Sequence, residues 1–225
     1  FKTPLSGIIT SAGLIEKYNQ LAYNDKIGSH VVTIKTLVNQ LNGILDDFLF
    51  LENAENDNYI PHLSWFKFCD LINRLVNDAT AILKEGQRIL VQPCSFKKEV
   101  YQDRKVVDII MRNILYNAIK YSGKNAVIII NIENGDSLKV TIKDHGIGIP
   151  KEALKHVFER FYRAKNALHL SGTGIGLNIV KVHLEKLNGT IAIESEERKG
   201  TTVTIELPTI QDTSKVASIS NTIID

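Results

Sequence analysis

Long hydrophobic runs and charge of one sign are both missing from this sequence of 225 residues. The most apolar stretch, residues 126–130, has the length of a β-strand, whereas a membrane-spanning helix needs about 20 apolar residues. No secretory signal pattern is present either. The chain starts at Phe1 rather than at a methionine, so we interpret it as a cytoplasmic piece of a longer protein, which we expect to be anchored in the cell membrane.

Cysteine is scarce. Cys69 and Cys94 are the only two, and they form no CxxC motif. This argues against a zinc site and against a disulfide scaffold, and it favours a reducing compartment.

The formal net charge is only +2, and Lys and Arg are spread along the chain, which argues against a nucleic-acid partner. Hydrophobic residues make up 44% and charged residues 23%, as in ordinary globular domains. The GxxxxGK[ST] pattern of a P-loop is absent.

The first part of the chain predicts a helical hairpin. Two apolar series follow 3–4 spacing on either side of a polar stretch at residues 24–26, and Ser29 is placed to cap the second helix. The first series consists of Leu5, Ile8, Ala12 and Ile15, and the second of Val31, Ile34, Val38, Leu41, Leu45 and Phe48. Such seams need a partner, so we predict a dimeric four-helix bundle made from two copies. The alternative is a hairpin that packs on its own domain.

A polar stretch at residues 52–58 has the composition of a linker, and mixed α/β patterns follow it. We predict helices over 66–83, from the cap Asp103 to about 121, and over 177–187. Strands are predicted over 88–92, 127–132, 138–142, 190–194 and 201–207. This order favours an α+β sandwich with helices on one face of a mostly antiparallel sheet. The expected domains are therefore 1–55 (hairpin), 56–208 (sandwich) and 209–225 (flexible tail or linker).

The predicted helix after Asp103 places three polar side chains on one face. Asn113, Asn117 and Lys120 are four and three positions apart. Amide oxygens suit a hard cation such as Mg²⁺, and an ammonium suits phosphate. The alternative is a polar face that merely meets water.

Three further motifs follow. Asp144 begins Asp-His-Gly-Ile-Gly-Ile-Pro, and a carboxylate there can accept a hydrogen bond from an amino-substituted ring. An aromatic and basic run at residues 158–163 could form a lid, or it could bury its aromatic rings in the core. Residues 171–177, Ser-Gly-Thr-Gly-Ile-Gly-Leu, open a helix whose free N–H groups can bind anions.

The glycine run also has a second interpretation. Glu194 lies 22 residues beyond Gly172, near the spacing of a dinucleotide-binding fingerprint. That fingerprint requires a buried strand directly before the glycines, and residues 163–171 are too polar for one.

In this order, the four motifs resemble the N, G1, F and G2 boxes of bacterial two-component sensor histidine kinases. The resemblance covers residues 1 to about 208, and Phe1-Lys2-Thr3-Pro4-Leu5 is similar to the end of the family's H box. It implies a homodimer through the hairpin and a Bergerat-type ATP-binding domain of the kind shared with gyrase. It also implies ATP and Mg²⁺ as cofactors and the receiver domain of a response regulator as a partner.

Site residues follow from the resemblance position by position. It implies that Asn117 ligates Mg²⁺ near Asn113, that Lys120 and Tyr121 face the phosphates, and that Asp144 holds the adenine amino group. Arg163 is expected at the γ-phosphate and Thr201 near the adenine. The backbone of the two glycine motifs would line the rest of the pocket: Gly146, Gly148, Gly172, Thr173, Gly174, Ile175, Gly176 and Leu177.

The family's phosphoacceptor histidine would precede Phe1. The sequence therefore predicts a chain that binds ATP without phosphorylating itself, with Thr3 at the position that serves dephosphorylation. In the longer protein we expect phosphorylation of a histidine and relay to an aspartate. The alternatives are a gyrase- or chaperone-type ATPase, argued against by the hairpin, and a dimeric scaffold that uses no nucleotide.

Overall fold

The computed structural model describes residues 2–20, 27–34, 37–38, 41, 45, 60–92, 99–135, 137–170 and 172–208. The chain divides into two compact units, Phe1–Asn53 and Ala54–Asp225. The predicted linker at 52–58 and the predicted tail at 209–225 lie outside the described residues, so the domain boundaries at 55 and 208 remain predictions.

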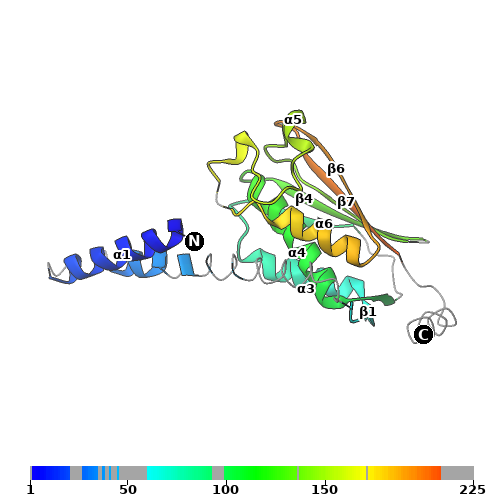
Figure 1. Cartoon of the computed structure of the whole chain (residues 1–225), viewed down its shortest axis with the longest axis horizontal. Helices are drawn as coiled ribbons and strands as arrows, with labels where there is room; N and C mark the ends of the chain where they lie inside the picture. Colours follow the sequence, from blue (N-terminus) through cyan, green and yellow to red (C-terminus); the bar gives the residue numbers. More distant parts are fainter. Residues whose placement is uncertain are drawn as a thin grey trace. The chain divides into compact units, whose positions relative to one another are not determined.

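The first unit contains helix α1 (Lys2–Gln20) and a second helical stretch at residues 27–34. Tyr18 stacks on His30 with 5.5 Å between ring centroids. A Cβ atom added to Gly7 would lie 2.7 Å from Cδ1 of Leu37. The two helical stretches therefore face each other, and the predicted hairpin is visible in part (Figure 1).

The predicted N-cap at Ser29 is wrong. Residues 27 and 28 are already helical, and the Ser29 carbonyl accepts a hydrogen bond of 2.9 Å from the Thr33 hydroxyl one turn later. A capping residue stands outside the helix, whereas Ser29 lies inside it. The prediction placed Gly28 in the turn before the helix. A glycine within a helix costs only about 1 kcal/mol, however, and need not end it.

The second unit is built around one mixed sheet of five strands in the order β2-β4-β5-β7-β6. The strands are β2 (Arg88–Val91), β4 (Val127–Asn134), β5 (Ser137–Lys143), β6 (Thr190–Glu196) and β7 (Gly200–Pro208). The pair β2 and β4 is parallel and the other pairs are antiparallel. The predicted sandwich with a mostly antiparallel sheet is confirmed.

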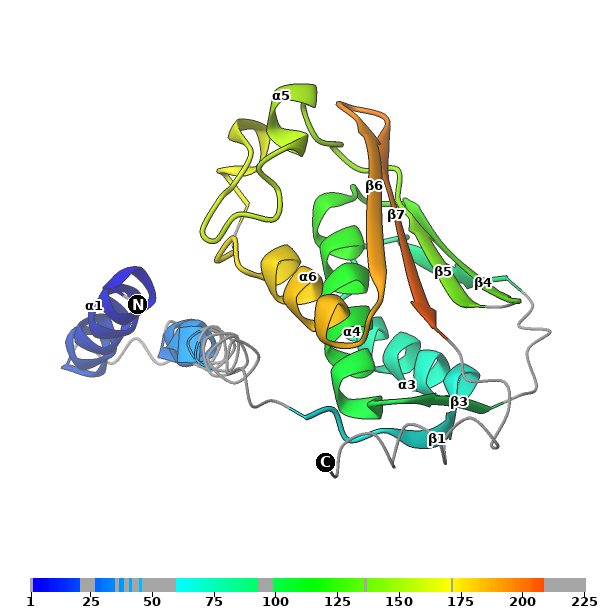
Figure 2. The ribbon, with the colours of Figure 1, turned by 45° about the vertical axis from the view of Figure 1, so that its right-hand side comes forward.

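Three helices cover one face of this sheet (Figure 2): α3 (Phe68–Thr80), α4 (Arg104–Tyr121) and α6 (Gly176–Lys186). Alternate residues of β5, including Leu138, Val140 and Ile142, are buried. Facing them, α4 buries residues at helical spacing such as Ile110 and Ile114. Because α4 lies at the centre of the helical layer, it is held firmly by the core.

The N-terminus of α4 is capped as predicted. Oδ1 of Asp103 accepts hydrogen bonds from the backbone amides of Lys105 at 3.0 Å and Val106 at 3.2 Å. Its Oδ2 also accepts one from the His62 amide at 2.8 Å. The cap thus ties the helix to the segment that leads into the domain.

A small antiparallel ribbon was missed. Strand β1 (Ser64–Lys67) pairs with β3 (Glu99–Gln102), so the helix predicted from residue 66 in fact begins at Phe68. In both strands the two apolar residues stand side by side, in Ser-Trp-Phe-Lys and in Glu-Val-Tyr-Gln, so the sequence shows no alternating pattern there. Short elements of this kind take their conformation from the partner strand.

The sequence argued against a disulfide scaffold, whereas Cys69 on α3 is disulfide-bonded. Cys94, the other cysteine of the chain, lies outside the described residues. A separation in sequence says nothing of the distance in space, which decides whether a bridge can form.

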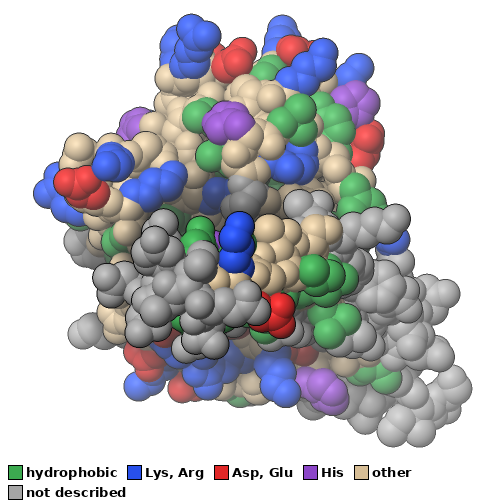
Figure 3. Space-filling view, turned by 90° about the vertical axis from the view of Figure 1, so that its left-hand side faces the viewer, with side chains coloured by type: hydrophobic (Ala, Val, Ile, Leu, Met, Phe, Trp, Pro, Cys, Tyr) green, Lys and Arg blue, Asp and Glu red, His purple; other side chains and the backbone are tan. Residues whose placement is uncertain are grey.

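Within the described residues, no helix combines the length and the apolar character that crossing a bilayer requires. On the face shown in Figure 3, Lys and Arg side chains are interspersed with Asp and Glu side chains. Among the described residues of that face, charges of both signs are therefore mixed.

The buried His183 on α6 gives a prediction about stability. Burial lowers the pKa of His183, although the nearby Asp103 carboxylate opposes part of this effect. The unfolded chain, with a histidine pKa of about 6.5, then binds more protons than the folded one at mildly acidic pH. The free energy of unfolding should therefore fall as the pH drops through about 6.5, and the loss should level off below the pKa of the folded state.

Urea unfolding of wild type and of His183→Gln between pH 7.5 and 5 measures this effect. We expect the variant to lose less stability on acidification than the wild type. His169→Gln, at an exposed position, is the control and should keep the wild-type slope. An unchanged slope in His183→Gln would contradict the assignment.

Candidate functional site

The polar face of α4 meets the start of α6. Asn113 donates from Nδ2 to the Ile109 carbonyl at 3.0 Å. A Cβ atom added to Gly176 would lie 2.7 Å from Oδ1 of Asn113 and 3.9 Å from Nδ2 of Asn117. The two predicted amides and the last glycine of the glycine run (residues 172–176) thus lie together.

Lys120 brings the other end of the glycine run to the same face. Its Nζ donates to the Tyr121 hydroxyl at 2.9 Å and lies against Gly172, where a side chain would collide with it. The two ends of the run therefore border the α4 face, which carries two amides and one ammonium.

Asp144 directly follows β5 and is only 6% exposed. Its Oδ1 accepts a hydrogen bond of 2.8 Å from the Gly146 amide. Burial raises the pKa of Asp144, and hydrogen bonds from the Gly146 and Thr201 backbones, together with His145, oppose the rise. A buried carboxylate with spare lone pairs is a strong acceptor for an N–H donor.

The Asp144 loop (residues 144–150) is fastened to the C-terminal end of α4. The Ile147 amide donates to the Tyr121 carbonyl at 3.1 Å, and a side chain at Gly146 would collide with the same carbonyl. Phosphate-facing and base-facing candidates are therefore joined through Tyr121, which directly follows Lys120.

The turn between β6 and β7 closes on the loop from the other side. The Arg198 amide donates to the Ile147 carbonyl at 2.8 Å. Gly148 has φ of 62°, and an added side chain would run into the Glu196 carbonyl. A glycine is needed there both for its left-handed backbone and for this close approach.

Ser195 joins the Asp144 loop to Thr201. Its hydroxyl oxygen lies 2.9 Å from the Ile149 amide, 2.8 Å from the Gly200 carbonyl and 2.9 Å from the Thr201 hydroxyl. Ser195 is a functional candidate that could not be predicted from the sequence, because a lone serine in a strand carries no recognisable signal.

Gln87 and Lys84, which were also not predicted from the sequence, hold the C-terminal end of α4. Gln87, 5% exposed, donates from Nε2 to the carbonyls of Ile119, Ser122 and Gly123 at 3.1, 3.3 and 2.9 Å. Lys84 donates to the carbonyls of Lys120, at 2.7 Å, and Ser122. Carbonyls at the end of a helix lack hydrogen-bond partners within the helix. Gln87 and Lys84, the clamp of α4, supply these partners for the turn that carries Lys120 and Tyr121.

The predicted lid segment is held by side-chain contacts to backbone. Arg163 donates from Nη2 to the carbonyls of Ala167, Leu168 and Leu170, so its guanidinium serves its own segment. Asn166 donates to the Gly148 carbonyl at 3.0 Å, which joins the segment to the Asp144 loop. The predicted contact of Arg163 with a γ-phosphate remains a prediction.

The remaining predicted residues divide between the glycine run and α1. The Thr173 hydroxyl accepts from the Ile175 amide at 3.3 Å, Ile175 is buried and Leu177 is half-buried. Gly174 has φ of 76° and lies against the backbone of Phe161 and Tyr162. Thr3 lies within α1 in the other unit, and its predicted role remains a prediction.

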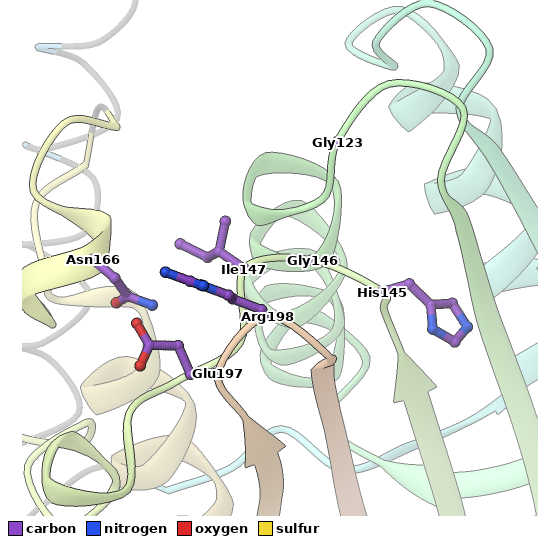
Figure 4. A pocket seen from close by; sticks show the side chains of 7 residues that line it. All are labelled: Gly123, His145, Gly146, Ile147, Asn166, Glu197 and Arg198. Carbon is purple, nitrogen blue, oxygen red and sulfur yellow. The ribbon is translucent and has the colours of Figure 1, made fainter.

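A cavity of about 410 Å³ borders the Asp144 loop. In Figure 4 the side chains of Ile147, Asn166, Glu197 and Arg198 lie together, while the His145 ring points away. The lining is completed by Gly123 and Gly146. Of the residues predicted to bind a ligand, only Gly146 lines it.

The donor set suits a cation bound together with a polyphosphate. Within the described part of the chain, no cluster of three or more His, Cys, Asp or Glu side chains could hold a metal ion. A cation here would depend on the amide oxygens of Asn113 and Asn117 and on oxygens of the ligand itself, which is the ligation that Mg²⁺ prefers.

Residues 102–211 match the family described as histidine kinase-, DNA gyrase B- and HSP90-like ATPase. The chain is 32% identical over 173 residues to the sensor histidine kinase WalK of Bacillus subtilis, covering 73% of this chain and 28% of WalK. It is 30% identical over 225 residues to the histidine protein kinase SaeS of Staphylococcus aureus (strain USA300), covering 95% of this chain and 62% of SaeS.

The fold resembles that of a solved structure, full-length ShkA in complex with AMPPNP, with a TM-score of 0.71 at 17% identity. The match covers 84% of this chain and 40% of ShkA. The chain spans less than two thirds of the length of the two curated relatives.

The clamp of Gln87 and Lys84 at the C-terminal end of α4 gives a prediction. Gln87→Leu keeps the volume and removes the donor to three carbonyls, so we expect the free energy of unfolding to fall by about 1–3 kcal/mol. Chemical denaturation measures it. Lys124→Met is the control, because Lys124 and Glu85 form an ion pair 2.9 Å long whose side chains are 70% and 78% exposed, and such pairs contribute at most about 1 kcal/mol. Equal stability of Gln87→Leu and wild type would show that the clamp is unimportant.

Proposed function

From the match of residues 102–211 to the histidine kinase-, DNA gyrase B- and HSP90-like ATPase family, we propose that this chain binds ATP with Mg²⁺ and donates the γ-phosphoryl group of the ATP to a histidine. The observation that carries this proposal is the junction at Tyr121, where the loop that begins with Asp144 is hydrogen-bonded to the end of the helix that carries Asn113, Asn117 and Lys120. ATP needs both ends of such a site, one for the triphosphate and one for the base.

Each group has a role in the proposed complex. Asn117, aided by Asn113, ligates Mg²⁺; Lys120 and Tyr121 face the phosphates, and the amides of the glycine run contribute further donors. Asp144 accepts a hydrogen bond from the adenine amino group, with Thr201 beside it. Arg163 would have to leave its carbonyl partners to reach the γ-phosphate.

The proposed chemistry needs mainly positioning and charge neutralisation. The bond between the γ-phosphorus and the oxygen bridging to the β-phosphate breaks, and a bond to a histidine nitrogen forms. Mg²⁺, Lys120 and the amides of the glycine run would offset the charge of the phosphates and of the ADP leaving group. The phosphoryl group would then pass to an aspartate of a response regulator receiver domain.

A kinase is favoured over a gyrase- or chaperone-type ATPase by the first unit. The similarity to SaeS extends over 95% of this chain, and that share reaches beyond the ATPase match at residues 102–211 into the helical part. Steady ATP hydrolysis by the chain alone would favour the ATPase instead.

For the whole protein we propose anchoring at the cell membrane by segments outside this chain, as expected for a sensor of this type. Recovery of the full-length protein in the membrane fraction of cells tests this, and a fully soluble protein would contradict it.

The first test of the proposal is Asp144→Asn. The amide presents an N–H group in place of one acceptor and lacks the charge, so we expect the affinity for ATP to fall about 10- to 100-fold, the equivalent of a hydrogen bond to a charged group. Calorimetric titration with ATP and Mg²⁺ measures it. Asp108→Asn on the same domain is the control, because the Asp108 carboxylate pairs with Arg74 and Arg112 on the helical layer.

The role of Asn117 as a Mg²⁺ ligand is tested with Asn117→Ala in the same titration. We expect this variant to lose most of the gain in affinity that Mg²⁺ gives the wild type. Full affinity in Asp144→Asn would remove the adenine assignment, and an unchanged magnesium effect in Asn117→Ala would remove the metal assignment.

We also propose a homodimer through the helical unit. Several residues of the apolar seams are exposed: Leu5 (47%), Val31 (38%), Val38 (40%) and Leu45 (47%). Others of the same seams, such as Ile8, Ile34 and Leu41, are half-buried within the hairpin. A second copy of the hairpin would bury the seam residues that remain exposed on the first, as in four-helix bundles.

Sedimentation equilibrium tests the dimer. We expect the wild type to sediment at twice the mass of one chain and Val31→Glu/Val38→Glu to shift toward the monomer. Thr33→Glu, also at an exposed position of the same stretch, is the control and should remain dimeric. A monomeric wild type at micromolar concentration would contradict the proposal.

A further inference from the structure

Three side chains form a row across three strands at the base-facing end of the site. Asp144 and Thr201 exchange both backbone hydrogen bonds, at 2.8 and 3.3 Å, so they stand directly opposite each other and their side chains point to the same face. Thr201 stands opposite Ser195 in the register of β6 and β7. The row Asp144–Thr201–Ser195 therefore continues the face that buries Ile142 and Ile205.

The hydrogen bonds of Ser195 leave one arrangement of protons that satisfies every contact. The Ile149 amide can only donate, so it donates to Oγ of Ser195. The Gly200 carbonyl can only accept, so the Ser195 proton goes to it. The remaining contact, 2.9 Å between the Ser195 and Thr201 hydroxyl oxygens, then needs the proton of Thr201.

The opposite arrangement leaves a contact without a proton. If Ser195 donated to Thr201, its oxygen and the Gly200 carbonyl would face each other at 2.8 Å as two acceptors. In the satisfied arrangement the Ser195 oxygen donates once and accepts twice, which is its full capacity. Thr201 is thereby committed as a donor toward Ser195.

This commitment fixes what Thr201 can offer to a ligand. With its proton turned to Ser195, its oxygen presents only lone pairs beside the Asp144 carboxylate. Two neighbouring acceptors favour a ligand with an N–H₂ group and disfavour one with a carbonyl, because the carbonyl would leave acceptors facing each other.

We propose that Ser195 is a positioning residue for nucleobase selection: by holding the Thr201 hydroxyl proton, it makes the site prefer a 6-amino purine over a 6-oxo purine. This inference rests on the proposed function, since it concerns the same ATP site. It assigns part of the discrimination to a residue that need not touch the nucleotide.

The test compares the dissociation constants of ATP and inosine triphosphate, measured by calorimetry with Mg²⁺ on the full 225-residue chain. The two nucleotides differ only in the donor pattern at C6 and N1 of the base. We expect the wild type to prefer ATP and Ser195→Ala to reduce that preference about three- to tenfold, since a freed Thr201 hydroxyl can turn and donate to the 6-oxo group.

Three further variants sharpen the result. Thr201→Val should reduce the preference to a similar degree, and the double variant with Ser195→Ala should add little, because both act on the same proton. Ser195→Thr keeps the hydroxyl and should keep the preference. The matched control is Ser137→Ala, at a half-buried serine at the opposite end of β5 from Asp144, and it should change nothing.

A merely structural role would give a different outcome. If Ser195 only supported the Asp144 loop through Ile149, Ser195→Ala would weaken both nucleotides by the same factor and leave their ratio unchanged, which would overturn the proposal. If Ser195→Ala does not fold, an unchanged ratio in Thr201→Val overturns it instead. A wild type that binds neither nucleotide would contradict the proposed function itself, and a wild type that binds both equally would contradict this inference alone.

Discussion

The hydrogen bond from the Ile147 amide to the Tyr121 carbonyl holds two separate parts of the chain in one place. One part is the end of α4, which carries Asn113, Asn117 and Lys120. The other is the loop that begins with the buried Asp144. Without this junction the domain would present a polar helix face and a buried carboxylate as unrelated features, and no single ligand could use both.

The junction is kept in place from several sides. Below it, Gln87 and Lys84 bind the last carbonyls of α4, so the turn that bears Lys120 and Tyr121 is held where helices commonly fray. On the other side, the turn after β6 meets the Asp144 loop so closely that Gly148 has no room for a side chain. The core of the sandwich supports both, because α4 lies in the centre of the helical layer and β5 in the centre of the sheet.

Much of this architecture could be predicted from the sequence where a local rule decides. Asp103 was correctly predicted as the N-cap of α4, and the strands predicted over 127–132 and 138–142 correspond to β4 and β5. The spacing of Asn113, Asn117 and Lys120 correctly placed all three on one helix face. The glycine run also opens α6 as predicted.

The rest depended on partners distant in sequence. Strands β1 and β3 show no alternation of apolar and polar residues, and their pairing is visible only in the structure. Gln87 resembles any polar loop residue in the sequence, and its role follows only from its hydrogen bonds to the end of α4. Ser195 is an ordinary strand serine until the register with Thr201 gives it three partners. Ser29 was predicted to cap a helix because serine is a common capping residue, but it lies inside the helix. The guanidinium of Arg163 binds carbonyls of its own segment, and its expected contact with a phosphate remains a prediction.

The claim that both parts serve one ligand is tested most directly by backbone amide NMR during titration with ATP and Mg²⁺. We predict that the resonances of Asn117, Gly146, Gly174 and Thr201 shift together and fit one dissociation constant. Shifts confined to one of the two parts, or two sets that saturate at clearly different concentrations, would contradict it.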